Sequence, residues 1–208
     1  QVVGLIRTTF LKRFESSVKA FEMSCTRLLQ KLLAFVEKNS TLESERSILA
    51  RWKKRNNDVL KARERQLELW GSDDDEDAEE DIVPQELLQS IEELDRKDYD
   101  VGAMLDETFQ DLETLVGFFK ELSKFTPNQD DKLKKLIRLL KTKELTGQKI
   151  LLFTEFAETA RYLKTELQKQ DIDGIEQVDS QRKLNRAEVI KAFAPYYNGT
   201  SSQELVDK

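Results

Sequence analysis

Apolar residues recur at alternating intervals of three and four along much of the chain, which is the spacing of one face of an α-helix. The longest unbroken series comprises Leu11, Phe14, Val18, Phe21, Cys25, Leu28, Leu32 and Phe35. Leu29, Leu33 and Val36 widen this stripe, so the helix should be buried more deeply than one strand of a two-stranded coiled coil. We expect one continuous helix over about residues 5–38.

Two further series predict two more long helices. The second, over residues 42–70, is weaker, with Asn56 and Arg63 at positions where apolar residues would be expected. The third keeps one register across residues 84–124 and has a proline at its first turn, a position that suits proline. The sequence therefore predicts long antiparallel helices over about 5–38, 42–70 and 84–124.

The charge of the chain is distributed unevenly. Eight of the nine residues over 73–81 are acidic. Such a run repels itself and cannot bury apolar area, so residues 71–82 are predicted to form a disordered loop. The formal net charge of −6 hides this asymmetry, so local patches indicate partners better than the total does.

A basic stretch precedes the acidic run. Its cations are Arg51, Lys53, Lys54, Arg55, Lys61, Arg63 and Arg65. They could form a positive helix face for the phosphates of DNA. Alternatively they form an ordinary solvated helix face, paired with Asp58, Glu64 and Glu68 or attracted to the acidic run. We favour the solvated face.

The last third of the chain has a different pattern. A Thr-Pro-Asn sequence at 126–128 ends the long helices and begins a shorter one, with Asn128 as its N-cap. A bare apolar run, Ile150 to Phe153, is typical of a buried parallel strand. The predicted order is helix, strand, helix, strand and helix, over about 130–144, 149–153, 155–169, 175–178 and 184–193. This order predicts a parallel sheet with a right-handed crossover.

Other features limit the class of protein. A single cysteine, Cys25, excludes an intramolecular disulfide framework and fits a reducing compartment, so we expect a cytoplasmic protein. No apolar run approaches the roughly 20 residues that a bilayer span needs, so no membrane partner is expected. Because the chain begins at Gln1 in what looks like running sequence, we expect it to be an internal segment of a longer protein.

Two neighbouring segments resemble a known family. Residues 131–140 (DKLKKLIRLL) and 148–156 (QKILLFTEF) resemble the beginning of the second RecA-like lobe of superfamily-two helicases. The likeness is to the SWI/SNF-type branch, which includes the bacterial RNA-polymerase-associated ATPase. Residues 148–156 resemble helicase motif four, and residues 174–193 resemble the strand and helix that follow it. Residues 5–17 are similar to the segment that follows motif three in large bacterial members.

The resemblance implies a division and a set of partners. Residues 1–125 would be a helical insertion or brace between the motor lobes, and residues 126–208 would be the N-terminal half of the second lobe. The fold class is then mainly α with a small α/β part, a partial parallel RecA-like sheet. The longer motor would bind double-stranded DNA and use ATP and Mg²⁺, and the helical part could dock a protein such as RNA polymerase. Missing strands would leave the truncated lobe prone to self-association.

The resemblance also implies nucleic-acid-binding residues. Thr154, Glu155 and Phe156 match the motif-four turn, which lies against the nucleic-acid backbone in the family. Arg182 and Arg186 fall on the following helical segment, where backbone contacts are also expected. A hydroxyl, a helix N-terminus and a cation can each bind a phosphate. The plainer alternative makes Thr154 a helix cap, Phe156 a core residue and both arginines solvated.

No catalytic, nucleotide-binding or metal residue is predicted within the chain. It has no Gly-x-x-x-x-Gly-Lys-Ser/Thr loop to hold ATP phosphates. Asp106-Glu107-Thr108 imitates a Mg²⁺-binding acidic box but falls inside a helical seam. The chain alone is therefore expected to be inactive, with ATP hydrolysis supplied by motifs elsewhere in a SWI/SNF-like helicase or DNA translocase. The alternative is a stand-alone helical interaction scaffold with no nucleic-acid role.

Overall fold

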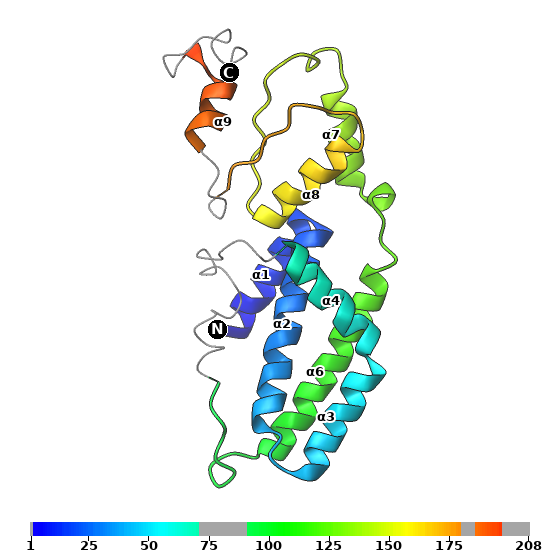
Figure 1. Ribbon diagram of the computed structural model, residues 1–208, viewed down its shortest axis with the longest axis vertical. Helices are drawn as coiled ribbons and strands as arrows, with labels where there is room; N and C mark the ends of the chain where they lie inside the picture. The colour runs from blue at the N-terminus through cyan, green and yellow to red at the C-terminus, as the bar shows by residue number, and fades with distance from the viewer. Residues whose placement is uncertain (1, 71–90, 180–185, 197–208) are drawn as a thin grey trace. The chain divides into compact units, whose positions relative to one another are not determined.

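The computed structural model describes residues 2–70, 91–179 and 186–196, which belong to two compact units, Gln1–Thr126 and Pro127–Lys208 (Figure 1). The first unit contains helices α1 (Val2–Ser16), α2 (Val18–Asn39), α3 (Glu43–Arg55), α4 (Asn57–Trp70) and α6 (Val101–Leu122). The second contains a 3-10 turn, η2 (Pro127–Gln129), and helices α7 (Asp131–Leu140), α8 (Ala157–Gln168) and α9 (Arg186–Phe193).

Short polar residues divide the first two predicted helices. Ser17 adopts an extended backbone (φ −160°, ψ 155°) and its side chain accepts a hydrogen bond from the N–H of Ala20 at 3.1 Å, so α2 starts anew there. Asn56 ends α3, and its Nδ2 donates to the carbonyl of Trp52 at 3.2 Å. Serine and asparagine offer the backbone such local hydrogen bonds, which compete with continuous helix.

The third predicted helix is not continuous over the described residues, and its predicted beginning, 84–90, lies outside them. Residues 91–100 are not helical, and α6 begins at Val101, where the Asp100 carboxylate accepts a hydrogen bond from the N–H of Ala103 at 3.0 Å. Leu94 nevertheless packs on the core, which explains why the apolar register continues through a segment that is not a helix. The predicted acidic loop, 71–82, lies outside the described residues.

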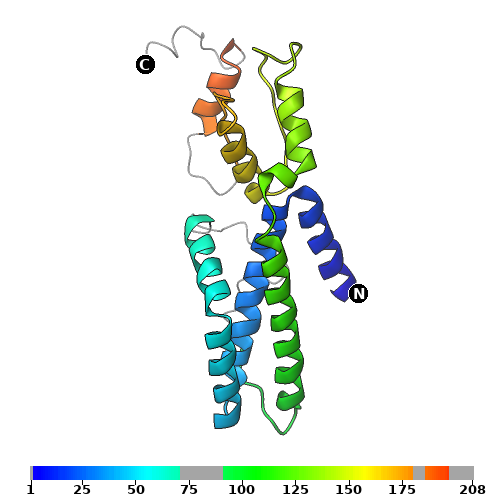
Figure 2. The same ribbon diagram turned by 90° about the vertical axis from the view of Figure 1, so that its right-hand side faces the viewer.

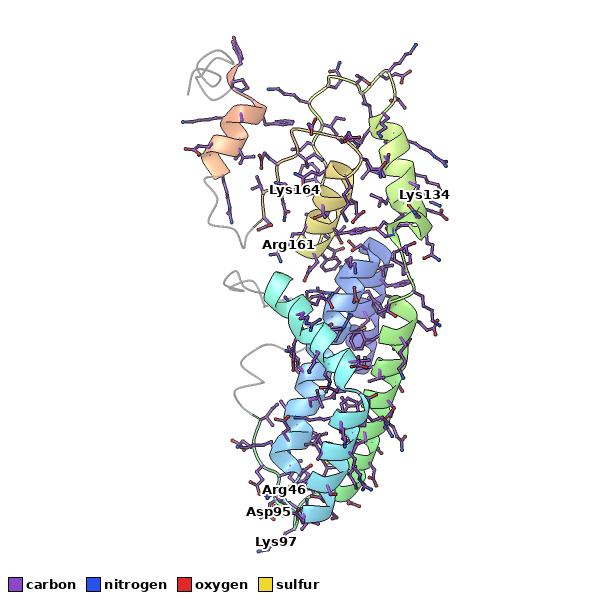
Figure 3. All side chains as sticks on the ribbon, turned by 45° about the vertical axis from the view of Figure 1, so that its right-hand side comes forward. Arg46, Asp95, Lys97, Lys134, Arg161 and Lys164 are labelled. Atoms are coloured by element: carbon purple, nitrogen blue, oxygen red, sulfur yellow. The ribbon has the colours of Figure 1, made fainter. Side chains whose placement is uncertain are left out.

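Polar contacts join residues 94–96 to the turn between α2 and α3. The N–H of Leu94 donates to Asn39 Oδ1 at 2.8 Å. Arg96 donates to Glu45 Oε2 at 2.6 Å and to Thr41 Oγ1 at 3.1 Å. Three further charged residues lie at the same end of the unit and are labelled in Figure 3: Arg46, Asp95 and Lys97. These contacts hold the approach to α6 in place without helical backbone.

Side-chain pairs define the direction of the helices. Ion pairs Lys53–Glu37 and Arg63–Glu22 show that α3 and α4 run antiparallel to α2. Arg55 pairs with Glu113, and the Arg63 guanidinium lies 4.9 Å from the centre of the Phe119 ring, so α4 and α6 run parallel to each other. The prediction of uniformly antiparallel helices is therefore wrong for this pair. Figure 2 shows α2 between the α3–α4 pair and α6.

The core of the first unit is shared among α2, α3 and α6. Its buried residues are Cys25, Leu29, Val36, Leu49, Trp52, Val101, Leu105, Leu112, Leu115, Val116 and Phe119. The members from α6 lie within the third predicted helix, 84–124. Leu11 and Phe14, by contrast, are 53% and 52% exposed, because they lie on α1, which Ser17 separates from α2.

A buried charge cluster crosses the core between α2 and α4. The Glu22 carboxylate accepts hydrogen bonds from Lys19 at 2.8 Å and from Arg63, whose Nη1 also donates to Gln66 Oε1 at 2.8 Å. Burial alone would raise the pKa of Glu22, but these cations outweigh burial and lower it. Burial and then the Glu22 charge raise the pKa of Cys25 to about 12, so this thiol is an inert core residue.

The predicted partial parallel sheet is wrong. No strand occurs among the described residues, and the segments predicted as strands, 149–153 and 175–178, have irregular backbone. Leu151, Leu152 and Phe153 are 62%, 51% and 83% exposed. A strand needs a neighbour for its backbone hydrogen bonds, and the described part of the chain places none beside this run. Apolar composition alone therefore did not produce a sheet.

Replacing Glu22 by glutamine should lower the free energy of unfolding by about 3 kcal/mol, because Arg63 is left buried without its counter-charge. Since the pKa of Glu22 is lowered on folding, its contribution is present above about pH 4.5 and is lost as the pH falls below that. Urea unfolding at pH 7 and pH 3.5 measures both effects.

The matched control is Glu37→Gln, which removes an equivalent but exposed pair with Lys53 and should cost less than about 1 kcal/mol. Equal losses from the two variants would contradict a special role for the buried pair.

Candidate nucleic-acid interface

The predicted motif-four turn lies directly before α8. Phe156 occupies the N-cap position with an extended backbone (φ −120°, ψ 134°), and its side chain is buried. Its carbonyl accepts hydrogen bonds from the N–H groups of Thr159 and Ala160 at 3.1 and 3.2 Å. Phe156 thus anchors the beginning of α8, as the plainer interpretation expects of a core residue.

Thr154 does not cap the helix. Its hydroxyl donates a hydrogen bond to the carbonyl of Phe156 at 3.1 Å, and α8 has no side-chain cap. Glu155, the residue between them, is exposed. The hydroxyl oxygen of Thr154 retains its acceptor lone pairs, and the exposed side chain could rotate to donate to a phosphate instead.

The electrostatics of this turn are mixed. The first N–H groups of α8, including those of Ala157 and Glu158, have no partner within the helix and point toward its N-terminus, where an anion is favoured. The Glu158 carboxylate is itself in this first turn and is buried, and Glu155 adds a second negative charge. A phosphate at this turn would therefore lie close to two carboxylates.

Of the two predicted arginines, one is described. Arg186 begins α9 and is exposed, whereas Arg182 lies outside the described residues. The Lys149 ammonium donates to the carbonyls of Ala192 and Phe193 at 3.2 and 2.6 Å, at the last turn of α9. A cation there complements the negative end of the helix dipole, so Lys149 attaches α9 to the beginning of the apolar run.

One hydrogen bond between the beginning of α7 and α8 was not predicted. Asp130, rather than the expected Asn128, is the N-cap of α7, and its Oδ1 accepts from the N–H of Leu133 at 2.9 Å. Its Oδ2 accepts from the hydroxyl of buried Tyr162, on α8, at 3.0 Å. The local sequence indicates a helix cap near 128–130. It cannot indicate a hydrogen bond between Asp130 and Tyr162, which lie 32 positions apart.

Three of the seven cations in the basic stretch of α3 and α4 form ion pairs within the first unit. Lys53, Arg55 and Arg63 pair with acids on other helices. The sequence offered Asp58, Glu64 and Glu68 as partners; the structure supplies Glu22, Glu37 and Glu113. Pairing across helices reduces the positive charge that this face could present to phosphates.

The described residues contain no group of three or more His, Cys, Asp or Glu side chains that could hold a metal ion. The sequence also lacks the glycine-rich phosphate loop. In the described part of the chain, no helix is long and apolar enough to span a bilayer.

No protein-family model, curated protein or solved structure matches the chain. The likeness to SWI/SNF-type helicases therefore depends on the motif residues themselves.

Replacing Tyr162 by phenylalanine should lower the free energy of unfolding by about 1 kcal/mol, because the Asp130 carboxylate loses a hydrogen bond in a partly buried site. Burial and the Asp130 charge raise the pKa of Tyr162, so the stabilisation should fade as the pH rises above about 10. Denaturation monitored by circular dichroism at pH 7 and 10.5 measures it. Tyr99→Phe, at an exposed tyrosine, is the control and should change stability little; an equal loss there would contradict the assignment.

Proposed function

We propose that this chain is a segment of an ATP-dependent, SWI/SNF-like DNA helicase or translocase. It would contribute the helical region between the motor lobes and the motif-four segment of the second lobe. The longer protein would bind ATP and Mg²⁺ through motifs outside this chain and move along double-stranded DNA in the cytoplasm. The helical unit would act as a brace and as a docking surface for a protein such as RNA polymerase.

One observation carries this proposal. The apolar run that resembles motif four ends in the Thr154–Phe156 turn and leads directly into α8, and its last apolar residue, Phe153, is 83% exposed. Together with Ile150, Leu151 and Leu152, which are also exposed, Phe153 forms a contiguous apolar patch, and such patches mark surfaces that bind another surface. Further parts of a motor lobe would provide that surface. The Thr154 hydroxyl and the N-terminus of α8 would then lie toward the DNA backbone.

ATP hydrolysis by the longer protein tests the proposal. Hydrolysis should be stimulated by duplex DNA, and Thr154→Val and Arg186→Gln should each lower the stimulated rate about three- to tenfold through loss of a phosphate contact. The control is Thr165→Val, on the exposed side of α8, which should leave the rate unchanged. The 208-residue chain alone should not hydrolyse ATP. A longer protein that has no DNA-stimulated hydrolysis would refute the proposal.

A second candidate function has its own supporting observation. Leu11, Phe14 and Phe118 of the first unit are all about half exposed, and the Phe21 ring makes edge-to-face contacts with both Phe14 and Phe118. An exposed aromatic patch of this kind is typical of a protein-interaction surface. A helical scaffold would use this patch and would bind its partner equally well after Thr154→Val, which separates it from the motor proposal.

The exposed run also leads us to expect self-association of the 208-residue chain. Sedimentation equilibrium should show oligomers at tens of micromolar, because two chains can cover each other's Leu151 to Phe153 side chains. Phe153→Ser should restore the monomer, whereas Phe14→Ser, at the other exposed patch, should not. A wild-type chain that stays monomeric at these concentrations would contradict this expectation.

A further inference from the structure

Helix α7 has two chemically different faces. Leu133 is buried, and Leu136, Ile137 and Leu140 are half-buried on the same side. At about 100° per residue, four of the five cations of α7 and of the residue after it fall within an arc of about 120° on the opposite side. These four cations are Lys134, Lys135, Arg138 and Lys141.

The basic face contains one acid, Asp131, whose pKa is lowered by its hydrogen bond to Lys134 and by the nearby charges of Lys135 and Arg138. Residues 132–143 contain six cations and no acid. Lys134 pairs with Asp131 at 2.7 Å, and Figure 3 shows Lys134 on α7. Lys135, Arg138 and Lys141 are exposed, and none of them forms an ion pair with a described residue. In the basic stretch of α3 and α4, by comparison, three of the seven cations pair with acids on other helices.

We propose that Lys135, Arg138 and Lys141 form a binding surface for the phosphate backbone of nucleic acid. The three side chains follow one another every third residue, so they form a row about 9 Å long. Duplex DNA carries one negative charge per roughly 1.7 Å of axis, so a row of this length meets several phosphates. A surface of this kind contacts phosphates and not bases, so it does not distinguish one DNA sequence from another. Its affinity comes from the release of counterions.

An anionic membrane is the other polyanion that a basic amphipathic helix can bind. Such a helix inserts its apolar face into the lipid. In this protein most of the apolar face of α7 is engaged: Leu133 is buried and Asp130 at the helix N-terminus is hydrogen-bonded to Tyr162 of α8, although Leu139 is 55% exposed. The basic face is the accessible one, which favours nucleic acid.

This surface is distinct from the Thr154–Phe156 turn, although it shares the nucleic-acid partner with the proposed function. The test therefore uses the 208-residue chain without ATP, so that it does not depend on motor activity. Failure of ATP hydrolysis in the longer protein would refute the motor and leave this surface untouched. If instead Thr154→Val abolished DNA binding and loss of the α7 cations did not, the α7 surface would be refuted and the motor proposal would stand.

The experiment is fluorescence anisotropy with a labelled 30-base-pair duplex at several salt concentrations between 50 and 200 mM. Wild type should bind with a Kd on the order of 10 μM. The triple variant Lys135→Gln/Arg138→Gln/Lys141→Gln should bind at least tenfold more weakly at 50 mM salt. Its slope of log K against log salt should be shallower by about 2.7, which is 0.9 for each of three phosphate contacts.

The matched control is Arg51→Gln/Lys54→Gln/Lys61→Gln, which removes the same charge from exposed positions on α3 and α4 and should change affinity less than twofold. The charge-retaining variant Lys135→Arg/Lys141→Arg should bind as wild type does, which separates loss of charge from loss of fold. Equal losses in both triple variants, or no DNA binding by wild type, would overturn the proposal. So would tighter binding to phosphatidylserine vesicles than to DNA.

Discussion

The ion pair between Glu22 and Arg63 fixes how the first unit is assembled. It joins α2 to α4 in one antiparallel register, and the Arg63 guanidinium also covers the Phe119 ring, which brings α6 into the same contact. Removing two charges from water is costly, so such a pair is retained where its geometry and its additional hydrogen bonds offset the desolvation. Lys19 and Gln66 supply those hydrogen bonds. The apolar core packs around a polar contact that permits few alternative registers.

Much of the helical unit could be predicted from spacing, because an amphipathic face is a local property of the sequence. The helix predicted over 84–124 by this spacing includes α6. The breaks at Ser17 and Asn56 were not predicted. At each of them one short side chain makes a hydrogen bond to the backbone that interrupts the helix, although the apolar pattern continues. Arg63 was recognised as misplaced in an apolar seam, but its partner Glu22 lies 41 residues away and could not be deduced from spacing.

The second unit shows a different limit of sequence reasoning. The beginning of α8 and the burial of Phe156 followed from the local pattern. The predicted sheet is absent from the described residues. A strand needs hydrogen bonds to a neighbouring strand, and the apolar composition of a segment does not determine whether such a neighbour exists. The hydrogen bonds of Lys149 to α9 and of Tyr162 to Asp130 join residues far apart in sequence, so they too required the structure. What results is an apolar run, held at one end by α9 and at the other by α8, with its side chains exposed.

Both the motor interpretation and the expected self-association depend on the exposed side chains of this run, which no neighbouring strand among the described residues pairs with. Hydrogen exchange of the dilute monomer, measured by mass spectrometry, tests this absence of pairing most directly. We predict slow exchange in α2 and α6, and exchange within seconds over residues 149–155 and 172–178. Protection of residues 149–155 equal to that of α6 in the monomer would contradict the account, because it would show that the run is already paired within the chain.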